Sequence, residues 1–209
     1  MRYICFMSNL IFCPHTDDAI FSLGSYILNN KNFTIASAFA GIPTDNAGYK
    51  KHTVLRGEHK EACNFINAKE VNGNLLDDVY GKQDKSLLVN WIEQTIRDHD
   101  TPEVLNLNVF LPLGIHHPDH IFLSDCLYEI IKKYNCIFFL YAELPYRVLY
   151  PELYEERLNK FKSKYKITQI NTVSNNKKLD AIKFYDSQID ENLIKKLLVE
   201  ENLWRIDND

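Results

Sequence analysis

Short apolar runs alternate with helical patterns through most of the chain, and this alternation is the strongest constraint on its fold. The apolar runs predict strands at 9–13, 33–39, 71–76, 104–109, 136–141 and 165–172. Apolar residues at helical spacing predict helices at 17–29, 53–67, 87–97, 118–134, 151–161, 177–187 and 192–204. Strands that alternate with helices through short loops indicate a mostly parallel sheet with helices on both faces. The predicted fold class is therefore α/β.

The length and composition are those of an ordinary globular protein. The 209 residues are enough for one sizeable domain and short for two, so we expect residues 1–209 to form a single domain. The formal net charge of -4 gives no basic excess that would favour nucleic acid or an anionic membrane as a partner. No apolar stretch approaches the roughly 20 residues that a membrane span needs. The Lys pairs at 132–133, 177–178 and 195–196 are interpreted as solvated faces.

The cysteines indicate a reducing compartment. Their number is odd, no Cys-x-x-Cys occurs, and each lies in an apolar setting: Cys5, Cys13, Cys63, Cys126 and Cys136. This usage fits reduced thiols in a cytoplasmic protein better than a disulfide framework.

Two clusters of metal-ligand side chains stand about a hundred residues apart. Residues 14–18 read Pro-His-Thr-Asp-Asp and residues 116–120 read His-His-Pro-Asp-His, each after a predicted strand and before a predicted helix. Open α/β sheets bind ligands at the carboxyl ends of their strands, so the two clusters are expected to meet there. A set of His15, Asp18 and His120 with an open position suits one catalytic zinc ion per chain. Asp17, beside the ligands, is placed to act as a general base.

The second cluster supplies further candidates. His117, three residues before His120, is expected to face the substrate, where an imidazolium would stabilise an oxyanion or protonate a departing amine. Asp119 is expected to accept a hydrogen bond from that imidazole. His116 could exchange roles with His117. The remaining histidines, His52, His59 and His99, are predicted to lie on the surface.

Each cluster alone also has a purely structural interpretation. Either could be a surface turn or a helix cap, and Asp17 and Asp18 could simply stabilise a helix N-terminus. The combination of both clusters after two strands favours the metal site.

The motifs resemble those of a known family. Residues 13–18 (Cys-Pro-His-Thr-Asp-Asp) resemble the first signature of the LmbE-like, PIG-L-type N-acetylglucosamine deacetylases, and 117–120 (His-Pro-Asp-His) resemble the second. Two weaker features also resemble the family: a helix with Arg56, Glu58 and Ala62, and the segment 178–188 (KLDAIKFYDSQ). Many members carry Glu after the Asp pair, whereas this chain has Ala19, which suggests a different contact to the substrate or the site.

This resemblance implies a Rossmann-like α/β fold and a zinc-dependent amide hydrolase that acts on N-acetylated sugars. By matching position, it implies zinc ligands at His15, Asp18 and His120. It also implies a base at Asp17 and an acid or oxyanion-stabilising residue at His117. Iron in place of zinc is compatible with the same ligands.

Substrate contacts are predicted outside the two clusters. Arg56 is expected to contact a sugar hydroxyl or a phosphate, and a buried ion pair with Glu58 is the structural alternative. Residues 141–146 leave a strand at the carboxyl edge of the sheet. There, Tyr141, Glu143 and Tyr146 are expected to line the sugar pocket, and core packing of the tyrosines is the alternative. The loop at 41–51 is a candidate substrate lid.

The leading functional hypothesis is N-deacetylation of a small-molecule N-acetyl sugar or sugar conjugate. A phosphoesterase is the second hypothesis, but it usually needs two metals and the sequence offers few ligands for another ion. A non-catalytic carbohydrate-binding protein is the third. Dinucleotide binding is disfavoured because no Gly-x-Gly-x-x-Gly follows the first strand. The oligomeric state stays open, with Trp204 a candidate for either the core or an interface.

Overall fold

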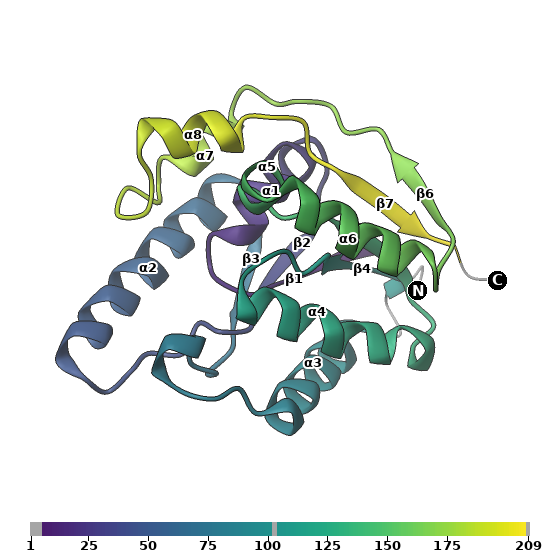
Figure 1. Ribbon diagram of the computed structural model, residues 1–209, viewed down its shortest axis with the longest axis horizontal. Helices are drawn as coiled ribbons and strands as arrows, with labels where there is room; N and C mark the ends of the chain where they lie inside the picture. The colour runs from purple at the N-terminus through teal and green to yellow at the C-terminus, as the bar shows by residue number, and fades with distance from the viewer. Residues whose placement is uncertain (1–5, 102–103, 208–209) are drawn as a thin grey trace, which may run out of the picture.

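The computed structural model describes residues 6–101 and 104–207, and its centre is one seven-stranded sheet in the order β3-β2-β1-β4-β5-β7-β6 (Figure 1). Its strands are β1 (Phe6–Cys13), β2 (Phe33–Ser37), β3 (Lys69–Asn72), β4 (Val104–Pro112), β5 (Ile137–Tyr141), β6 (Ile167–Ile170) and β7 (Leu203–Ile206). The strands β1 to β5 pair in parallel, whereas β7 pairs antiparallel with both β5 and β6. The predicted α/β class with a mostly parallel sheet is confirmed.

Helices cover both faces of this sheet. The α-helices are α1 (Asp18–Asn29), α2 (Asn46–Phe65), α3 (Lys85–His99), α4 (Pro118–Ile130), α5 (Tyr146–Leu149), α6 (Pro151–Lys162), α7 (Lys178–Ile182) and α8 (Glu191–Leu197), with short 3₁₀ turns η1 (Asp78–Tyr80) and η2 (Ile131–Lys133). Buried side chains of α1, α2, α7 and α8 pack in one core, and those of α3, α4 and α6 pack in the other.

The second half of the central strand β1 shows why its residues are apolar at consecutive positions. Leu10 and Phe12 belong to the core beneath α3 and α4, whereas Ile11 and Cys13 belong to the core beneath α1. All four are 0% exposed. Successive side chains of a strand point to opposite faces, so a strand covered on both sides must be apolar at every position.

The strand order places a crevice at the carboxyl ends of β1 and β4. From β1 the chain proceeds to β2 and β3 on one side, and β4 and β5 lie on the other. The strand order thus reverses direction at β1. Where neighbouring strands lead to connections on opposite sides, a gap remains at their carboxyl ends, and α/β proteins bind ligands in that gap. Because β1 ends at Cys13 and β4 ends at Pro112, the two predicted clusters follow strands that are hydrogen-bonded neighbours.

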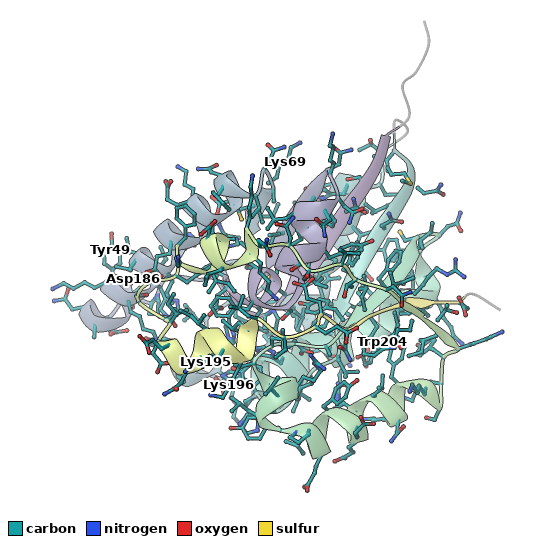
Figure 2. All side chains as sticks on the ribbon, turned by 90° about the horizontal axis from the view of Figure 1, so that it is seen from above. Tyr49, Lys69, Asp186, Lys195, Lys196 and Trp204 are labelled. Carbon is teal, nitrogen blue, oxygen red and sulfur yellow. The ribbon has the colours of Figure 1, made fainter. Side chains whose placement is uncertain are left out.

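The C-terminal part differs from the sequence prediction. The helix predicted at 192–204 ends at Leu197, and the chain then forms β7, in which Trp204 pairs with Leu140. Trp204 is 5% exposed and belongs to the core (Figure 2). The helix predicted at 177–187 is also too long, since α7 ends at Ile182.

The candidate lid is shorter than predicted. Helix α2 begins at Asn46 rather than at residue 53, because the Asp45 side chain accepts a hydrogen bond from the Gly48 amide and caps the helix. Much of the predicted loop at 41–51 is therefore the first turn of a helix.

Four of the five cysteines lie in the described part of the chain, and all four have free thiols. Cys13, Cys63, Cys126 and Cys136 are unpaired and buried, and Cys5 lies outside the described residues. Within those residues, no helix combines the length and apolar character needed to cross a membrane.

One of the lysines predicted to be solvated is buried. Lys195 extends from α8 into solvent (Figure 2), but Lys178 is 3% exposed and its Nζ lies 2.8 Å from Glu201 Oε1. The Glu201 carboxylate also accepts hydrogen bonds from the backbone amides of Ser25 (2.8 Å) and Tyr26 (2.9 Å) in α1. This buried ion pair therefore ties the C-terminal segment to the helix that follows the first cluster.

We predict that Glu201→Gln lowers the free energy of unfolding by about 3–5 kcal/mol, because it leaves the Lys178 ammonium buried without a carboxylate. Asp180→Asn is the control, since the Asp180–Lys183 pair is 56% and 58% exposed. An exposed pair of this kind contributes about 1 kcal/mol or less. Chemical denaturation of the two variants and the wild type measures both losses. Equal small losses would contradict a structural role for the buried pair.

Candidate active site

Three side chains from the two clusters converge at the crevice. The Asp18 Oδ2 atom lies 3.3 Å from His15 Nδ1 and 3.3 Å from His120 Nε2. His15 follows β1, Asp18 begins α1, and His120 lies in the first turn of α4. The three residues offer ligand atoms that lie within 4.8 Å of one another, as a single metal ion requires. The structure thus brings together the three residues predicted as ligands.

His120 carries the observation that fits a cation best. Its side chain is 0% exposed, and its buried Nε2 atom faces the Asp18 carboxylate at 3.3 Å without forming a hydrogen bond to that or any other described residue. Its other ring nitrogen, Nδ1, lies 3.3 Å from Glu143 Oε1. A carboxylate on one imidazole nitrogen orients the opposite nitrogen for a metal and raises its basicity. Two histidines and one carboxylate are a usual ligand set for catalytic zinc.

Glu143 is held in turn by the loop after β4. Its carboxylate accepts hydrogen bonds from the backbone amides of Leu113 (3.0 Å), Gly114 (2.7 Å) and Ile115 (3.2 Å). Gly114 has a φ of +82°, and a Cβ there would lie 2.6 Å from that of Ser124, so this tight turn requires glycine. Glu143 was predicted to line a sugar pocket, and that prediction is wrong. It is 0% exposed and supports His120 instead.

Asp119 holds the other histidine. The Asp119 Oδ2 atom lies 3.1 Å from His15 Nε2, and the same carboxylate accepts hydrogen bonds from Asp78 N (3.1 Å) and Gln83 Nε2 (2.6 Å). The predicted hydrogen bond from the His117 imidazole to this carboxylate is not formed. It is the backbone amide of Asp119 that donates to His117 Nδ1, at 3.2 Å, as the cap of α4. Asp119 thus orients His15 rather than His117.

Charge is concentrated at the three converging residues. Burial raises the pKa of Asp18, but the neighbouring His120 and His15 outweigh it and hold that pKa well below its usual range. Burial lowers the pKa of His120, but Asp18 and Glu143 reverse the effect and raise it to about 9. The pKa of His15 is also raised, because hydrogen bonds to Asp119 and Asp18 outweigh its burial. A cluster that stabilises positive charge this strongly is suited to bind a metal ion in place of the protons on its two imidazoles.

Asp17 stands beside the cluster with its carboxylate free. It lines the cavity, and no hydrogen bond to its side chain from another described residue is found. Burial, followed by the negative charge of Asp18, raises its pKa to about 6. A carboxylate with a pKa near the working pH is suited to accept a proton from water and to release it again.

His117 faces the cavity, whereas His116 does not. His116 has a φ of +64° and is exposed, and its ring stacks on Tyr150 at a centroid distance of 3.7 Å. His117 lines the cavity, and its ring centroid lies 5.0 Å from that of His15. Burial and the neighbouring His15 and His120 lower the pKa of His117, so the neutral ring rather than the predicted imidazolium is favoured. Because Nδ1 accepts a hydrogen bond, the proton of the neutral ring sits on Nε2.

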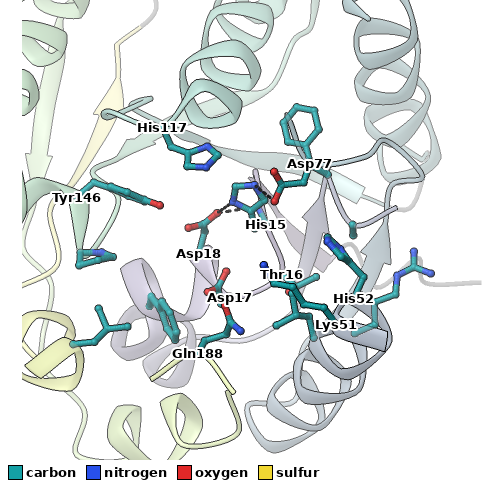
Figure 3. Close-up of a pocket in the computed structure, with 17 residues that line it drawn as sticks. His15, Thr16, Asp17, Asp18, Lys51, His52, Asp77, His117, Tyr146 and Gln188 are labelled. Carbon is teal, nitrogen blue, oxygen red and sulfur yellow. Dashed lines mark hydrogen bonds and ion pairs between the residues drawn. The ribbon is translucent and has the colours of Figure 1, made fainter. Parts of the chain in front are cut away.

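A cavity of about 250 Å³ opens in front of these residues (Figure 3). This volume is near the lower end of ligand sites, about 300–1,000 Å³. Arg56 and Tyr146, two of the residues expected to contact a substrate, line the cavity. Tyr141 does not, because it is 0% exposed and its hydroxyl donates to Phe12 O at 2.9 Å. Tyr141 therefore packs in the core, which was the alternative to a place in the sugar pocket.

The alternative interpretation of Arg56 fails. The Glu58 carboxylate accepts hydrogen bonds from Ser187 N and Oγ, both at 2.8 Å, and forms no ion pair with Arg56. Ala19, at the position where the resemblance led us to look for Glu, is 0% exposed in the core beneath α1.

The sequence interpretation missed several residues that line the cavity. Asp77 lies 3.7 Å from His15 Nε2, and His52, predicted to be exposed, is 5% exposed (Figure 3). Lys51 and Gln188 also line the cavity. The Asp77–Asp78 pair follows β3 in the same way as the first cluster follows β1, and this repeated pattern was a usable signal.

His59 was also predicted to be exposed, and it is 0% exposed. Its Nδ1 lies 2.9 Å from the Tyr185 hydroxyl, which donates to the backbone carbonyl of Thr16 at 3.0 Å. Burial and the charge of Arg56 lower the pKa of His59 to about 4, so the ring is neutral. The chain from His59 through Tyr185 therefore fixes the loop that carries the first cluster.

Comparison with known proteins agrees with this geometry. The model of the PIG-L family, described as GlcNAc-PI de-N-acetylase, matches residues 10–131, more than half of the sequence and the part that carries both clusters. The chain belongs to the PIG-L family. No protein with a curated description matches its sequence.

Solved structures extend the likeness of this PIG-L family member to the whole fold. The A40926 pseudoaglycone deacetylase Dbv21 is similar with a TM-score of 0.72 and 19% identity, over 95% of this chain and 96% of that one. The N,N'-diacetylchitobiose deacetylase from Pyrococcus horikoshii has a TM-score of 0.57 and 16% identity, over 96% and 83%. GalB, the 4-carboxy-2-hydroxymuconate hydratase from Pseudomonas putida, has a TM-score of 0.62 and 13% identity, over 98% and 97%. A fold shared with a hydratase does not determine the reaction.

We predict about one zinc or iron ion per chain in the purified protein and its loss in His120→Ala, because three ligands define one site. His116→Ala is the matched control, since His116 points away from the cluster and its loss should leave the metal content unchanged. Elemental analysis of the three proteins after dialysis measures this. Metal retained by His120→Ala would show that the ion binds elsewhere.

Proposed function

We propose that this PIG-L family member is a metal-dependent hydrolase that removes the acetyl group from an N-acetylated amino sugar or sugar conjugate. The observation that carries the proposal is the convergence of His15, Asp18 and His120 beside the free carboxylate of Asp17 at the cavity wall. The family match and the similarity to the A40926 pseudoaglycone deacetylase and the N,N'-diacetylchitobiose deacetylase support the same reaction.

The metal would be zinc or iron, held by His15, Asp18 and His120. When bound, such an ion supplies a Lewis acid that lowers the pKa of water toward neutrality. The protein does the rest of the chemistry. In this proposal, Asp17 takes the proton from the attacking water and later transfers it to the departing amine nitrogen.

The acyl oxygen requires hydrogen-bond donors as it gains negative charge. In this proposal His117 Nε2–H is one, because His117 lines the cavity and the Asp119 amide occupies Nδ1, which leaves the proton of the neutral ring on Nε2. Donors that are fixed before the reaction stabilise a developing oxyanion without reorganisation. In this assignment Asp119 is a positioning residue for His15, and Glu143 is one for His120.

The volume of the cavity bears on the size of the substrate, and the cysteines bear on the cellular compartment. A volume of about 250 Å³ favours a small molecule, such as one amino sugar and part of its attached group. The free, buried cysteines are typical of a reducing compartment, and we propose that the enzyme works in the cytoplasm.

We predict that Asp17→Asn lowers kcat for amine release from an N-acetyl sugar by about 10²–10⁴-fold, the usual contribution of a general base. The metal content should stay unchanged, because Asp17 is not one of the three ligands. The matched control is Asp186→Asn, the same chemical change at an exposed position. Full amine-releasing activity in Asp17→Asn would refute this role.

The pH dependence provides a second test of Asp17. The base must be ionised, so kcat/KM should rise with pH through an acid limb with an apparent pKa of about 6 or lower. The value is an upper limit, because a nearby metal cation would lower the pKa of the carboxyl. A pH profile of kcat/KM for the metal-loaded enzyme measures this limb. The same limb in the residual activity of Asp17→Asn would assign it to another group.

A further inference from the structure

The cavity is divided by charge. Asp17, Asp18 and Asp77 line the part next to the metal ligands. The opposite wall is formed by α2, which contributes Lys51, His52 and Arg56 (Figure 3 labels the first two). His52 and Arg56 are four residues apart on α2, so they lie on one face of the helix. Figure 3 shows Lys51 and His52 across the cavity from Tyr146.

Arg56 has no polar partner in the described part of the chain. It is the one arginine among the described residues without a hydrogen bond or ion pair, whereas each of the others has at least one: Arg97, Arg147, Arg157 and Arg205. Its Nε atom is buried and forms no hydrogen bond with any described residue. A guanidinium offers five donors, and leaving a buried donor unsatisfied costs free energy. Such a side chain on a cavity wall is prepared for an acceptor that enters with the ligand.

The neighbours of Arg56 do not supply that acceptor. Glu58 is engaged by Ser187 on another side of α2. Lys51 also lacks a carboxylate within 4.0 Å in the described part of the chain. Two carboxylates act electrostatically on His52, and both are already engaged: Asp45 caps α2, and Asp77 caps η1 and lies 3.7 Å from His15.

His52 adds a second unsatisfied polar atom. It is 5% exposed, it lines the cavity, and its buried Nε2 has no hydrogen-bond partner among the described residues. Its ring is held edge-on against Tyr80, at a centroid distance of 5.4 Å. Burial lowers its pKa, so at neutral pH it can donate a hydrogen bond without adding charge.

We propose that Lys51, His52 and Arg56 form a subsite for an anionic oxygen group, a phosphate or a carboxylate, carried by the amino sugar. The inference rests on the proposed deacetylase function and narrows its substrate to an anionic N-acetyl amino sugar derivative. Arginine binds such planar or tetrahedral anions with two parallel hydrogen bonds, and lysine adds charge. Separation of this subsite from the acidic part of the cavity fixes which end of the substrate faces the metal ligands.

Amine release from matched substrates tests the subsite. The substrates are N-acetylglucosamine, its 1-phosphate, its 6-phosphate and the carboxylate-bearing N-acetylmuramic acid. We expect at least one anionic substrate to exceed N-acetylglucosamine in kcat/KM by about tenfold or more, the scale of one charge-assisted hydrogen bond. Preference for a phosphate or for the carboxylate identifies the group that is recognised.

Variants assign the preference to these residues. The ratio of kcat/KM for the anionic and neutral substrates should fall by about tenfold in Arg56→Gln and in Lys51→Gln. Lys50→Gln is the matched control, because it removes the same charge from an exposed neighbour on α2 that does not line the cavity. An unchanged ratio in both Arg56→Gln and Lys51→Gln, or a preference for the neutral sugar, overturns the proposal.

A binding measurement separates this proposal from the deacetylase proposal. If no substrate releases an amine, the deacetylase function fails and the subsite is tested by calorimetry with glucose 1-phosphate, glucose 6-phosphate, glucuronate and glucose. Tighter binding of a charged sugar that is lost in Lys51→Gln supports an anion subsite on its own. Equal affinity of the wild type for charged and neutral sugars overturns it. Because Lys51 is exposed, its variant is expected to fold even if Arg56→Gln does not.

Discussion

The Asp18 carboxylate is the interaction on which the site depends. It is 4% exposed, it accepts a hydrogen bond from the His15 amide at 2.8 Å, and it joins two histidines that come from opposite sides of the crevice. A buried carboxylate is costly unless positive charge compensates it. Asp119 and Glu143 add negative charge to the outer nitrogens of the same two imidazoles. The centre of the cluster therefore requires a cation, either protons on the imidazoles or a metal ion that replaces them.

Much of this arrangement follows from the sequence, because it depends on local pattern and on the geometry of parallel sheets. Apolar runs such as Ile11 to Cys13 are typical of central strands, and polar residues that follow neighbouring parallel strands meet at one edge of the sheet. The sequence could not reveal partners whose acceptors or donors exist only after folding. Glu143 binds three backbone amides in a turn after β4, and His59 meets Tyr185 across 126 residues. Neither contact leaves a local pattern.

The same reason explains the errors in the C-terminal part. Leu203, Trp204 and Ile206 have a spacing that suits a helix or a strand, and only the free edge of β5 decides between them. Short elements take their structure from what they pack against rather than from propensity. Lys178 was misplaced because a lysine is usually solvated, whereas here α1 and Glu201 give it a buried partner.

The weaker motif residues acquire a physical role in the structure. Glu58 holds Ser187, Tyr185 holds the carbonyl of Thr16, and Glu201 joins Lys178 to α1. Together these contacts fasten α2, the C-terminal segment and the loop after β1 to one another. Because α2 also contributes Lys51, His52 and Arg56 to the cavity wall, the contacts that hold the loop after β1 also fix the distance between these side chains and the candidate metal ligands. A hydratase shares this fold, so the reaction cannot be read from the sheet and helices. The proposed chemistry depends on the residues that this framework brings to the cavity: the candidate metal ligands and base at one wall, and at the other polar side chains without a partner among the described residues.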